Sequence, residues 1–230
     1  GAVLAGRPAG ARDGARGADR GRAGAQAAPS VCSSLPDGDA LLAVVRQGIG
    51  PPPVASRTFV DLSTIGIPAA QEAAGLLAGA GVAYLDAPVS GGVAGAKAAT
   101  LTVMAAGDRD VFDRIEPLLA TFAAHRAHVG DAPSQGQAMK LLNNFLSGTA
   151  MVATSEALRF GRRQGLDPAL MLEVLNASSG QNTATRDKFP RLLAGERDLG
   201  FRAALLAKDL RLYLEGARTS ATAGEVGETV

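Results

Sequence analysis

Hydrophobic residues along the chain follow two different patterns, which meet near residue 130. Between residues 31 and 130, short apolar and β-branched runs alternate with longer amphipathic segments. The short runs predict strands and the longer segments predict helices. The expected strands include 58–62, 82–86, 101–105 and 126–129, and the expected helices are 40–45, 68–80 and 110–122. This alternation is typical of an α/β domain with a mostly parallel sheet.

Beyond this point the pattern is entirely helical. A long helix is expected over 134–163, with Ser134 as its N-cap and Gln137 completing a capping box. Further helices are expected over 167–176 and 201–217, and the chain after them is expected to be frayed. The sequence therefore predicts an α/β domain followed by an all-α domain, joined by the long helix.

The first thirty residues differ from the rest in composition. Ala, Gly and Arg occupy 22 of positions 1–30, and no helical or strand periodicity is present. Such a segment has too few large apolar side chains to offset the entropy lost on ordering. We expect 1–30 to be a disordered or non-native segment, 31–130 to be the α/β domain and 131–230 to be the helical domain.

Composition and charge exclude several classes of function. The net charge is +1 and the chain has no Trp, so neither nucleic acid nor a membrane surface is an expected partner. No apolar run is long enough for a membrane span. The lone Cys32 excludes an internal disulfide and suits a reducing cytoplasm. His125 and His128 form no metal-ligand pattern, so no metal site is expected.

A stripe of small and polar residues runs along the 134–163 helix. Gly136, Lys140, Asn144 and Gly148 are each four residues apart, which places them on one helix face. A lysine among apolar positions is costly to bury unless it faces a polar cleft, where it can donate or accept a proton. The alternative is a lysine that reaches solvent between helices, with Asn144 capping a carbonyl.

The segment 87–99 is expected to be a loop rich in Gly and Ser. Ser90, Gly91 and Gly92 follow a predicted strand and offer a hydroxyl and accessible backbone N–H groups, which could hold a small anion. An ordinary flexible loop is the alternative.

Three further segments carry weaker signals. Leu35-Pro36 and Thr64 lie where predicted strands end, the edge at which open α/β sheets bind ligands. Lys208 and Asp209 form a charged pair within the helix 201–217, and a solvated helix face would explain them equally well.

Taken together, these segments resemble the β-hydroxyacid dehydrogenases, most closely the 3-hydroxyisobutyrate dehydrogenase and tartronate semialdehyde reductase branch. The resemblance rests on Asp86-Ala-Pro-Val-Ser-Gly-Gly, Gly136-x-x-x-Lys140-x-x-x-Asn144 and Lys208-Asp-Leu, in this order. Leu35-Pro-Asp-Gly and Asp61-Leu-Ser-Thr64 also match, so the resemblance covers about residues 31–215. It implies a partial Rossmann-type domain, a 6-phosphogluconate-dehydrogenase-like helical domain that forms a homo-oligomer, and an active site between the two domains.

The resemblance also implies an activity and residue roles. The reaction is an NAD- or NADP-dependent interconversion of a small 3-hydroxy acid and its semialdehyde. Lys140 is the implied acid/base, and the substrate is held by Ser90, Gly91, Gly92 and Asn144. The implied cofactor-binding residues are Leu35, Pro36, Thr64 and Lys208.

The sequence departs from the family's pattern near its start. The family opens with a strand and a Gly-x-Gly-x-x-Gly turn that holds the pyrophosphate, and residues 1–30 contain glycines without that spacing. We therefore expect weak cofactor binding. An alternative function is a catalytically inactive remnant that acts only as a helical oligomerisation or interaction module.

Overall fold

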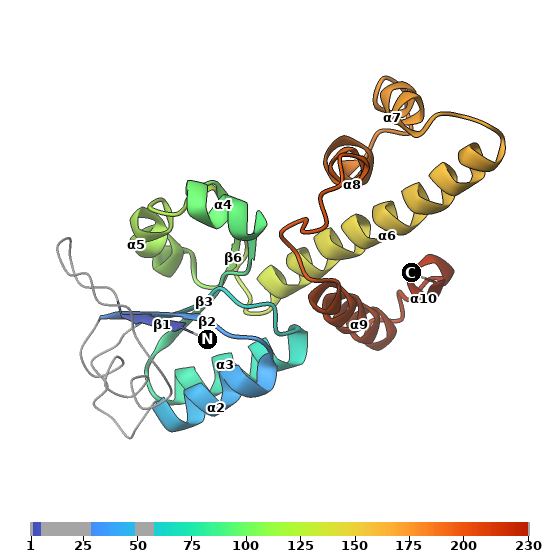
Figure 1. Cartoon of the computed structure of the whole chain (residues 1–230). Helices are drawn as coiled ribbons and strands as arrows, with labels where there is room; N and C mark the ends of the chain where they lie inside the picture. Colours follow the sequence, from blue (N-terminus) through green and yellow to red (C-terminus); the bar gives the residue numbers. More distant parts are fainter. Residues whose placement is uncertain (1, 6–28, 49–57, 230) are drawn as a thin grey trace. The chain divides into compact units, whose positions relative to one another are not determined.

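The computed structural model describes residues 2–5, 29–48 and 58–229, which divide into two compact units (Figure 1). Unit 1 is Gly1–Leu141 and unit 2 is Leu142–Val230. The division falls inside one long helix, later than the boundary at residue 130 that the sequence pattern predicts.

Unit 1 is built on a mixed sheet with the strand order β1-β2-β3-β4-β6-β5, and β7 pairs with β6. The strands are β1 (Ala2–Ala5), β2 (Ser30–Ser34), β3 (Thr58–Asp61), β4 (Ala83–Asp86), β5 (Val89–Ser90), β6 (Leu101–Ala106) and β7 (Ala123–Gly130). β2, β3 and β4 are parallel, as are β6 and β7. The pairs β1–β2, β4–β6 and β5–β6 are antiparallel. The predicted α/β class is confirmed, with more antiparallel pairing than the alternation alone indicated.

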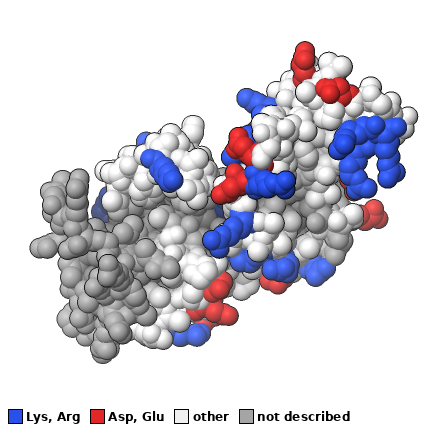
Figure 2. Space-filling view, viewed as in Figure 1, with Lys and Arg blue, Asp and Glu red and all other residues white. Residues whose placement is uncertain are grey.

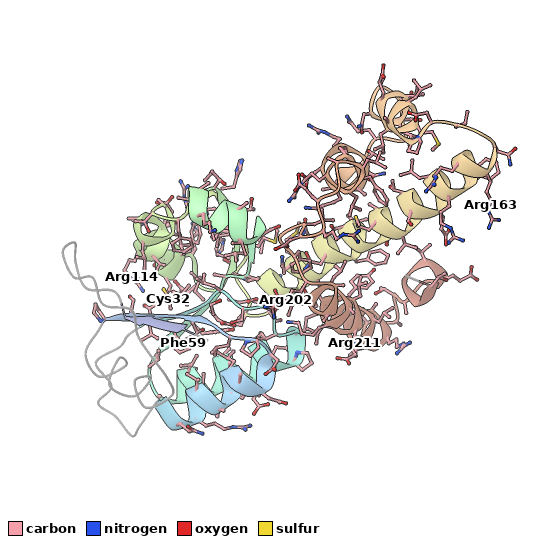
Figure 3. All side chains as sticks on the ribbon, in the orientation of Figure 1. Cys32, Phe59, Arg114, Arg163, Arg202 and Arg211 are labelled. Atoms are coloured by element: carbon pink, nitrogen blue, oxygen red, sulfur yellow. The ribbon has the colours of Figure 1, made fainter. Side chains whose placement is uncertain are left out.

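Helices cover both faces of this sheet (Figure 1). α2 (Gly38–Gly48) and α3 (Ile67–Gly79) pack on one face, where Phe59 belongs to the core. α5 (Arg109–Leu119) packs on the other face, where Cys32 belongs to a second core cluster. Figure 3 labels Phe59 and Cys32 on these opposite faces. Buried aliphatic side chains such as Leu77 and Leu119 therefore fix the sheet between two helical layers.

Two predictions about unit 1 need correction. The segment 87–99 is not a loop, because it contains β5 and the short helix α4 (Gly92–Ala98). α4 lies close against β6, since a Cβ on Gly95 would be 3.1 Å from Cδ2 of Leu101. The segment 1–30 contains β1, which pairs with β2 from Ala2 opposite Ser34 to Ala5 opposite Val31. The rest of the expectation for 1–30 falls on 6–28, outside the described residues.

Unit 2 is all-helical, as predicted. It begins within α6 (Gln135–Arg163) and continues with α7 (Pro168–Asn176), the π-helical turn η1 (Ala184–Lys188), α8 (Phe189–Leu193), α9 (Ala203–Thr219) and α10 (Glu225–Thr229). α9 packs against residues 144–148 of α6, where the rings of Phe145 and Tyr213 stack with centroids 4.3 Å apart. The end of the chain, expected to be frayed, forms α10 instead.

Charged side chains of both signs are intermixed on the face seen in Figure 2, in keeping with a net charge of +1. Within the part of the chain that the structure describes, no helix has the length and apolar character needed to span a membrane.

Candidate active site

A row of buried polar side chains lies at the carboxyl ends of β2, β3 and β4. Ser33, Asp61 and Asp86 are in register across the three parallel strands, and all three are buried. The Ser33 hydroxyl donates to Oδ1 of Asp61 at 2.7 Å, and the Ser63 hydroxyl donates to the same oxygen at 2.6 Å. Two carboxyl groups therefore lie side by side in the interior, at the sheet edge where ligands bind in open α/β folds.

Burial shifts the titration of this cluster. It raises the pKa of Asp61, against the opposing effect of hydrogen bonds from Ser63 and Ser33. It raises the pKa of Asp86 to about 7; hydrogen bonds from Gln137 oppose that shift and the charge of Asp61 adds to it. Tyr84 also acts on Asp61 and lowers its pKa. Among the described residues, Oδ2 of Asp61 and the hydroxyl of Tyr84 are both buried.

Gln137, in the first turn of α6, connects this cluster to the helix. Its Nε2 donates to Oδ1 of Asp86 at 2.6 Å and to the carbonyl oxygen of Ser63 at 3.0 Å. Its Oε1 accepts from the backbone N–H groups of Ile65 at 2.8 Å and Gly66 at 3.2 Å. The side chain is 0% exposed, so all of its hydrogen-bonding capacity is used inside the protein.

The capping box predicted for α6 is wrong. The N-terminus of the helix is capped by Asp86, whose Oδ2 accepts from the backbone N–H of Gln137 at 2.8 Å. Ser134 has a φ of 82°, and its hydroxyl accepts from Nε2 of Gln71 at 3.4 Å. A carboxylate from β4 takes the place of the local cap because it lies directly at the positive end of the helix.

The stripe of residues four apart on α6 is present and closely packed. A Cβ on Gly136 would lie 2.6 Å from the carbonyl oxygen of Met104, so only glycine allows this approach of helix to sheet. Lys140 is 7% exposed and Asn144 is 6% exposed. The burial of Lys140 argues against a side chain that reaches solvent, and its role as the acid/base stays a prediction.

In unit 2, α9 supplies a carboxylate to this stripe. Nδ2 of Asn144 donates to Oδ2 of Asp209 at 2.6 Å, and Nζ of Lys208 lies 3.2 Å from the other oxygen of Asp209. Asp209 thus fixes the orientation of the Asn144 amide. The sequence pattern identified Lys208-Asp209 as a charged pair, but local spacing could not predict that the Asp209 carboxylate contacts α6.

The segment carrying Ser90, Gly91 and Gly92 joins β5 to α4. Gly91 and Gly92 have φ values of 126° and 62°, a region that residues with a side chain rarely adopt. Both glycines are exposed and Ser90 is half-buried, so their backbone groups and the hydroxyl are accessible. This geometry suits the binding of a small carboxylate.

The predicted cofactor residues divide between the units. Leu35 and Pro36 follow β2 and Thr64 follows β3, and the Leu35 N–H donates to Oγ of Ser63 at 2.8 Å. The two loops therefore lie together at one sheet edge. Lys208 lies on α9 in unit 2. In the described part of the chain, no three metal-ligating side chains form a cluster.

Comparison with known proteins divides the chain in a similar way. Residues 7–130 match the family model described as the NAD binding domain of 6-phosphogluconate dehydrogenase, a match that begins inside the segment expected to be non-native. Residues 134–230 match the model described as NAD-binding of NADP-dependent 3-hydroxyisobutyrate dehydrogenase.

Individual proteins are also similar. The chain is 35% identical over 208 residues to 2-(hydroxymethyl)glutarate dehydrogenase from Eubacterium barkeri, covering 89% of this chain and 69% of that protein. It is 37% identical over 218 residues to 3-hydroxyisobutyrate dehydrogenase from Pseudomonas aeruginosa, covering 89% and 72%. The solved structure of Mycobacterium tuberculosis 3-hydroxyisobutyrate dehydrogenase with L-serine has a TM-score of 0.81 and 29% identity, covering 90% of this chain and 73% of that one.

Proposed function

The chain belongs to the β-hydroxyacid dehydrogenase family, whose members use NAD or NADP, and we propose that it interconverts a small 3-hydroxy acid and its semialdehyde with Lys140 as the acid/base. The observation that carries this proposal is the burial of Lys140 in line with Asn144 on α6. A buried lysine beside an oriented amide is suited to exchanging a proton with an alcohol oxygen.

The substrate class follows from the compounds named for three relatives. 2-(Hydroxymethyl)glutarate, 3-hydroxyisobutyrate and L-serine each carry a CH₂OH group on the carbon that bears a carboxylate. We propose that this chain oxidises the same unit, a CH₂OH group bonded directly to the carbon that bears the carboxylate. The other substituent on the carboxylate-bearing carbon differs among the three compounds, so the proposal does not specify it.

The residues divide the work of the reaction. A bound nicotinamide would supply the hydride acceptor for the carbinol carbon. Lys140 takes the hydroxyl proton as its neutral amine and returns it in the reverse direction. Asn144 is held by Asp209 and by Asn143, whose Nδ2 donates to Oδ1 of Asn144 at 3.1 Å, and it orients the same oxygen through its second amide N–H. The Ser90–Gly92 segment binds the carboxylate, which fixes the other end of the molecule.

We propose that the loops after β2 and β3 bind the nicotinamide end of a dinucleotide. Leu35 and Pro36 offer an apolar wall and Thr64 a hydroxyl, and the hydrogen bond from Leu35 to Ser63 keeps the two loops together. The proposed role of Lys208, which lies on α9 in unit 2, rests on the family resemblance alone. The expectation of weak cofactor binding rests on residues 1–30, of which 6–28 lie outside the described residues.

A substrate panel tests the proposal. 3-Hydroxyisobutyrate, L-serine and 2-(hydroxymethyl)glutarate should each be tried with NAD⁺ and NADP⁺ at millimolar cofactor, and formation of the reduced cofactor followed at 340 nm. At least one of these primary alcohols should react, whereas 2-hydroxybutyrate, a secondary alcohol that carries its hydroxyl on the carboxylate-bearing carbon, should not. Equal rates with 2-hydroxybutyrate would contradict the proposed substrate class.

The helical unit supports a second proposal, that it associates with another copy of the chain. Large apolar side chains are exposed along α6, including Leu146 at 61% and Phe160 at 68%. Exposed apolar surface of this kind is typical of protein–protein interfaces. The alternative function, an inactive oligomerisation module, predicts the same association without any reduction of the cofactor. We also propose a cytoplasmic location, because the lone Cys32 suits a reducing compartment.

A further inference from the structure

Gln137 touches three segments to which the proposed function assigns roles. Its Oε1 accepts from Ile65 and Gly66 in the loop that carries Thr64. Its Nε2 donates to Asp86, the last residue of β4, four residues before Ser90. Its backbone belongs to the first turn of α6, three residues before Lys140. All of these contacts lie within unit 1.

We propose that Gln137 is a positioning residue, which holds Lys140 in fixed register with the segments that carry Thr64 and Ser90. This inference rests on the proposed function, because it assigns a purpose to the placement of Lys140. Gln137 does not touch the reacting atoms in this account; it acts through the helix that it anchors.

The chemistry of the site requires an amide. Two backbone N–H groups need one acceptor oxygen, while a carbonyl oxygen and a carboxylate need two N–H donors. A primary amide of this length meets both needs with a single side chain. An ionised glutamate would place its charge against Asp86, and methionine would leave all four groups without this partner.

Two further contacts make the anchor rigid. Both oxygens of Asp86 accept from Gln137, one from the side chain and one from the backbone. Gly136 lies so close to the sheet that a Cβ would be 2.7 Å from the carbonyl oxygen of Asp86. The first turn of α6 is therefore held by two hydrogen bonds and a close backbone contact, which limits the positions that Lys140 can take.

The test compares Gln137→Met and Gln137→Glu with the matched control Gln135→Met. Gln135 lies in the same turn but is exposed, and its side chain accepts only from the nearby N–H of Ala132. Folding is checked by circular dichroism and by protection of the buried Cys32 from alkylation. In Gln137→Met, kcat should fall about 100-fold while KM changes less than threefold, because displacing a catalytic group by about 1 Å costs on this order. The control should match the wild type.

The Gln137→Glu variant adds a pH readout. The titratable groups facing this position are Asp86 on β4, with Asp61 and Tyr84 beside it, and Lys140 on the next turn of α6. A protonated glutamate offers an acceptor and one donor, so the ratio of variant to wild-type kcat should rise as the pH falls from 8 to 5.5. A flat ratio, or a folded Gln137→Met with kcat within threefold of wild type, would overturn the inference.

A third readout does not depend on turnover. Acylation of Lys140 by an amine reagent, with the exposed Lys97 as internal reference, should rise about tenfold in Gln137→Met and stay constant in Gln135→Met. Unchanged labelling of Lys140 would overturn the inference even if no hydroxy acid is a substrate, a result that would by itself refute the proposed function. Loss of folding in both Gln137 variants would assign the residue to fold stability and also overturn the positioning role.

Discussion

Raising the pH from 5 to 8 should lower the free energy of unfolding of unit 1, because two carboxyl groups are buried side by side at its centre. Burial raises the pKa of Asp86 from 3.8 to about 7 and raises that of Asp61 as well. Between the unfolded and folded pKa values, the folded protein holds a proton that the unfolded chain has released. The free energy of unfolding therefore falls as the pH rises through this window, and it levels off above about pH 7.

The size of the effect follows from the shift of Asp86. One proton corresponds to about 1.4 kcal/mol per pH unit, so Asp86 alone contributes at most about 3 kcal/mol between pH 5 and pH 7. With a urea dependence of about 2 kcal/mol per M, the unfolding midpoint should move by about 1 to 1.5 M. Asp61 contributes with the same sign.

Cys32 provides a probe that reports on this unit alone. It is the lone cysteine and lies in the core of unit 1, so its alkylation in increasing urea follows the opening of that unit. Asp86→Asn should show a smaller decrease in midpoint between pH 5 and pH 7 than the wild type. The control Asp113→Asn alters an exposed pair with Arg109 and should leave the pH dependence unchanged. A wild-type midpoint that is constant or rises with pH, or an unchanged dependence in Asp86→Asn, would refute the reasoning.

Three other predictions concern the site and the surface. Asn144→Ala and Asp209→Leu should each lower kcat about tenfold. The double variant should lose no more than either single variant, because the two side chains are hydrogen-bonded and act as one unit. A 100-fold loss of kcat in the double variant would show that the two residues act independently. Ser90→Ala should raise KM for the hydroxy acid about tenfold with kcat nearly unchanged, since about 1.4 kcal/mol of binding to a carboxylate is lost; an unchanged KM would remove Ser90 from the substrate site. Phe160→Glu should reduce the mass measured by analytical ultracentrifugation to that of a monomer, because a charge is placed on an exposed apolar side chain; a wild-type that is already monomeric would contradict the proposed association.

Sequence patterns predicted the elements that carry a strong local signal. The β-branched and apolar run at Thr58–Asp61 forms β3, and the helix expected at 68–80 is α3. β1 was missed because its four residues, Ala-Val-Leu-Ala, are too few to show a strand period, and α4 was missed because five of its seven residues are Gly or Ala. The structure of these two segments depends on tertiary contacts: β1 pairs with β2, and α4 packs against β6. Neither contact can be predicted from the local spacing of residues.

The same distinction applies to the site. The spacing of Lys140 and Asn144 on one helix face could be predicted, because it depends only on helical geometry. The role of Gln137 could not, since its partners Asp86 and Ser63 lie 51 and 74 residues away in the chain. A local capping box was the available interpretation, and only the fold brings Asp86 to the end of α6.

Chemical rescue of a Lys140 variant tests the central claim most directly. Lys140→Ala should form no measurable reduced cofactor with the substrate that the wild type oxidises, and its helical content should be unchanged because alanine favours helices. Added methylamine or ethylamine should then restore turnover in proportion to the concentration of the neutral amine, because the amine takes the place of the missing base. Wild-type kcat in Lys140→Ala would contradict the account.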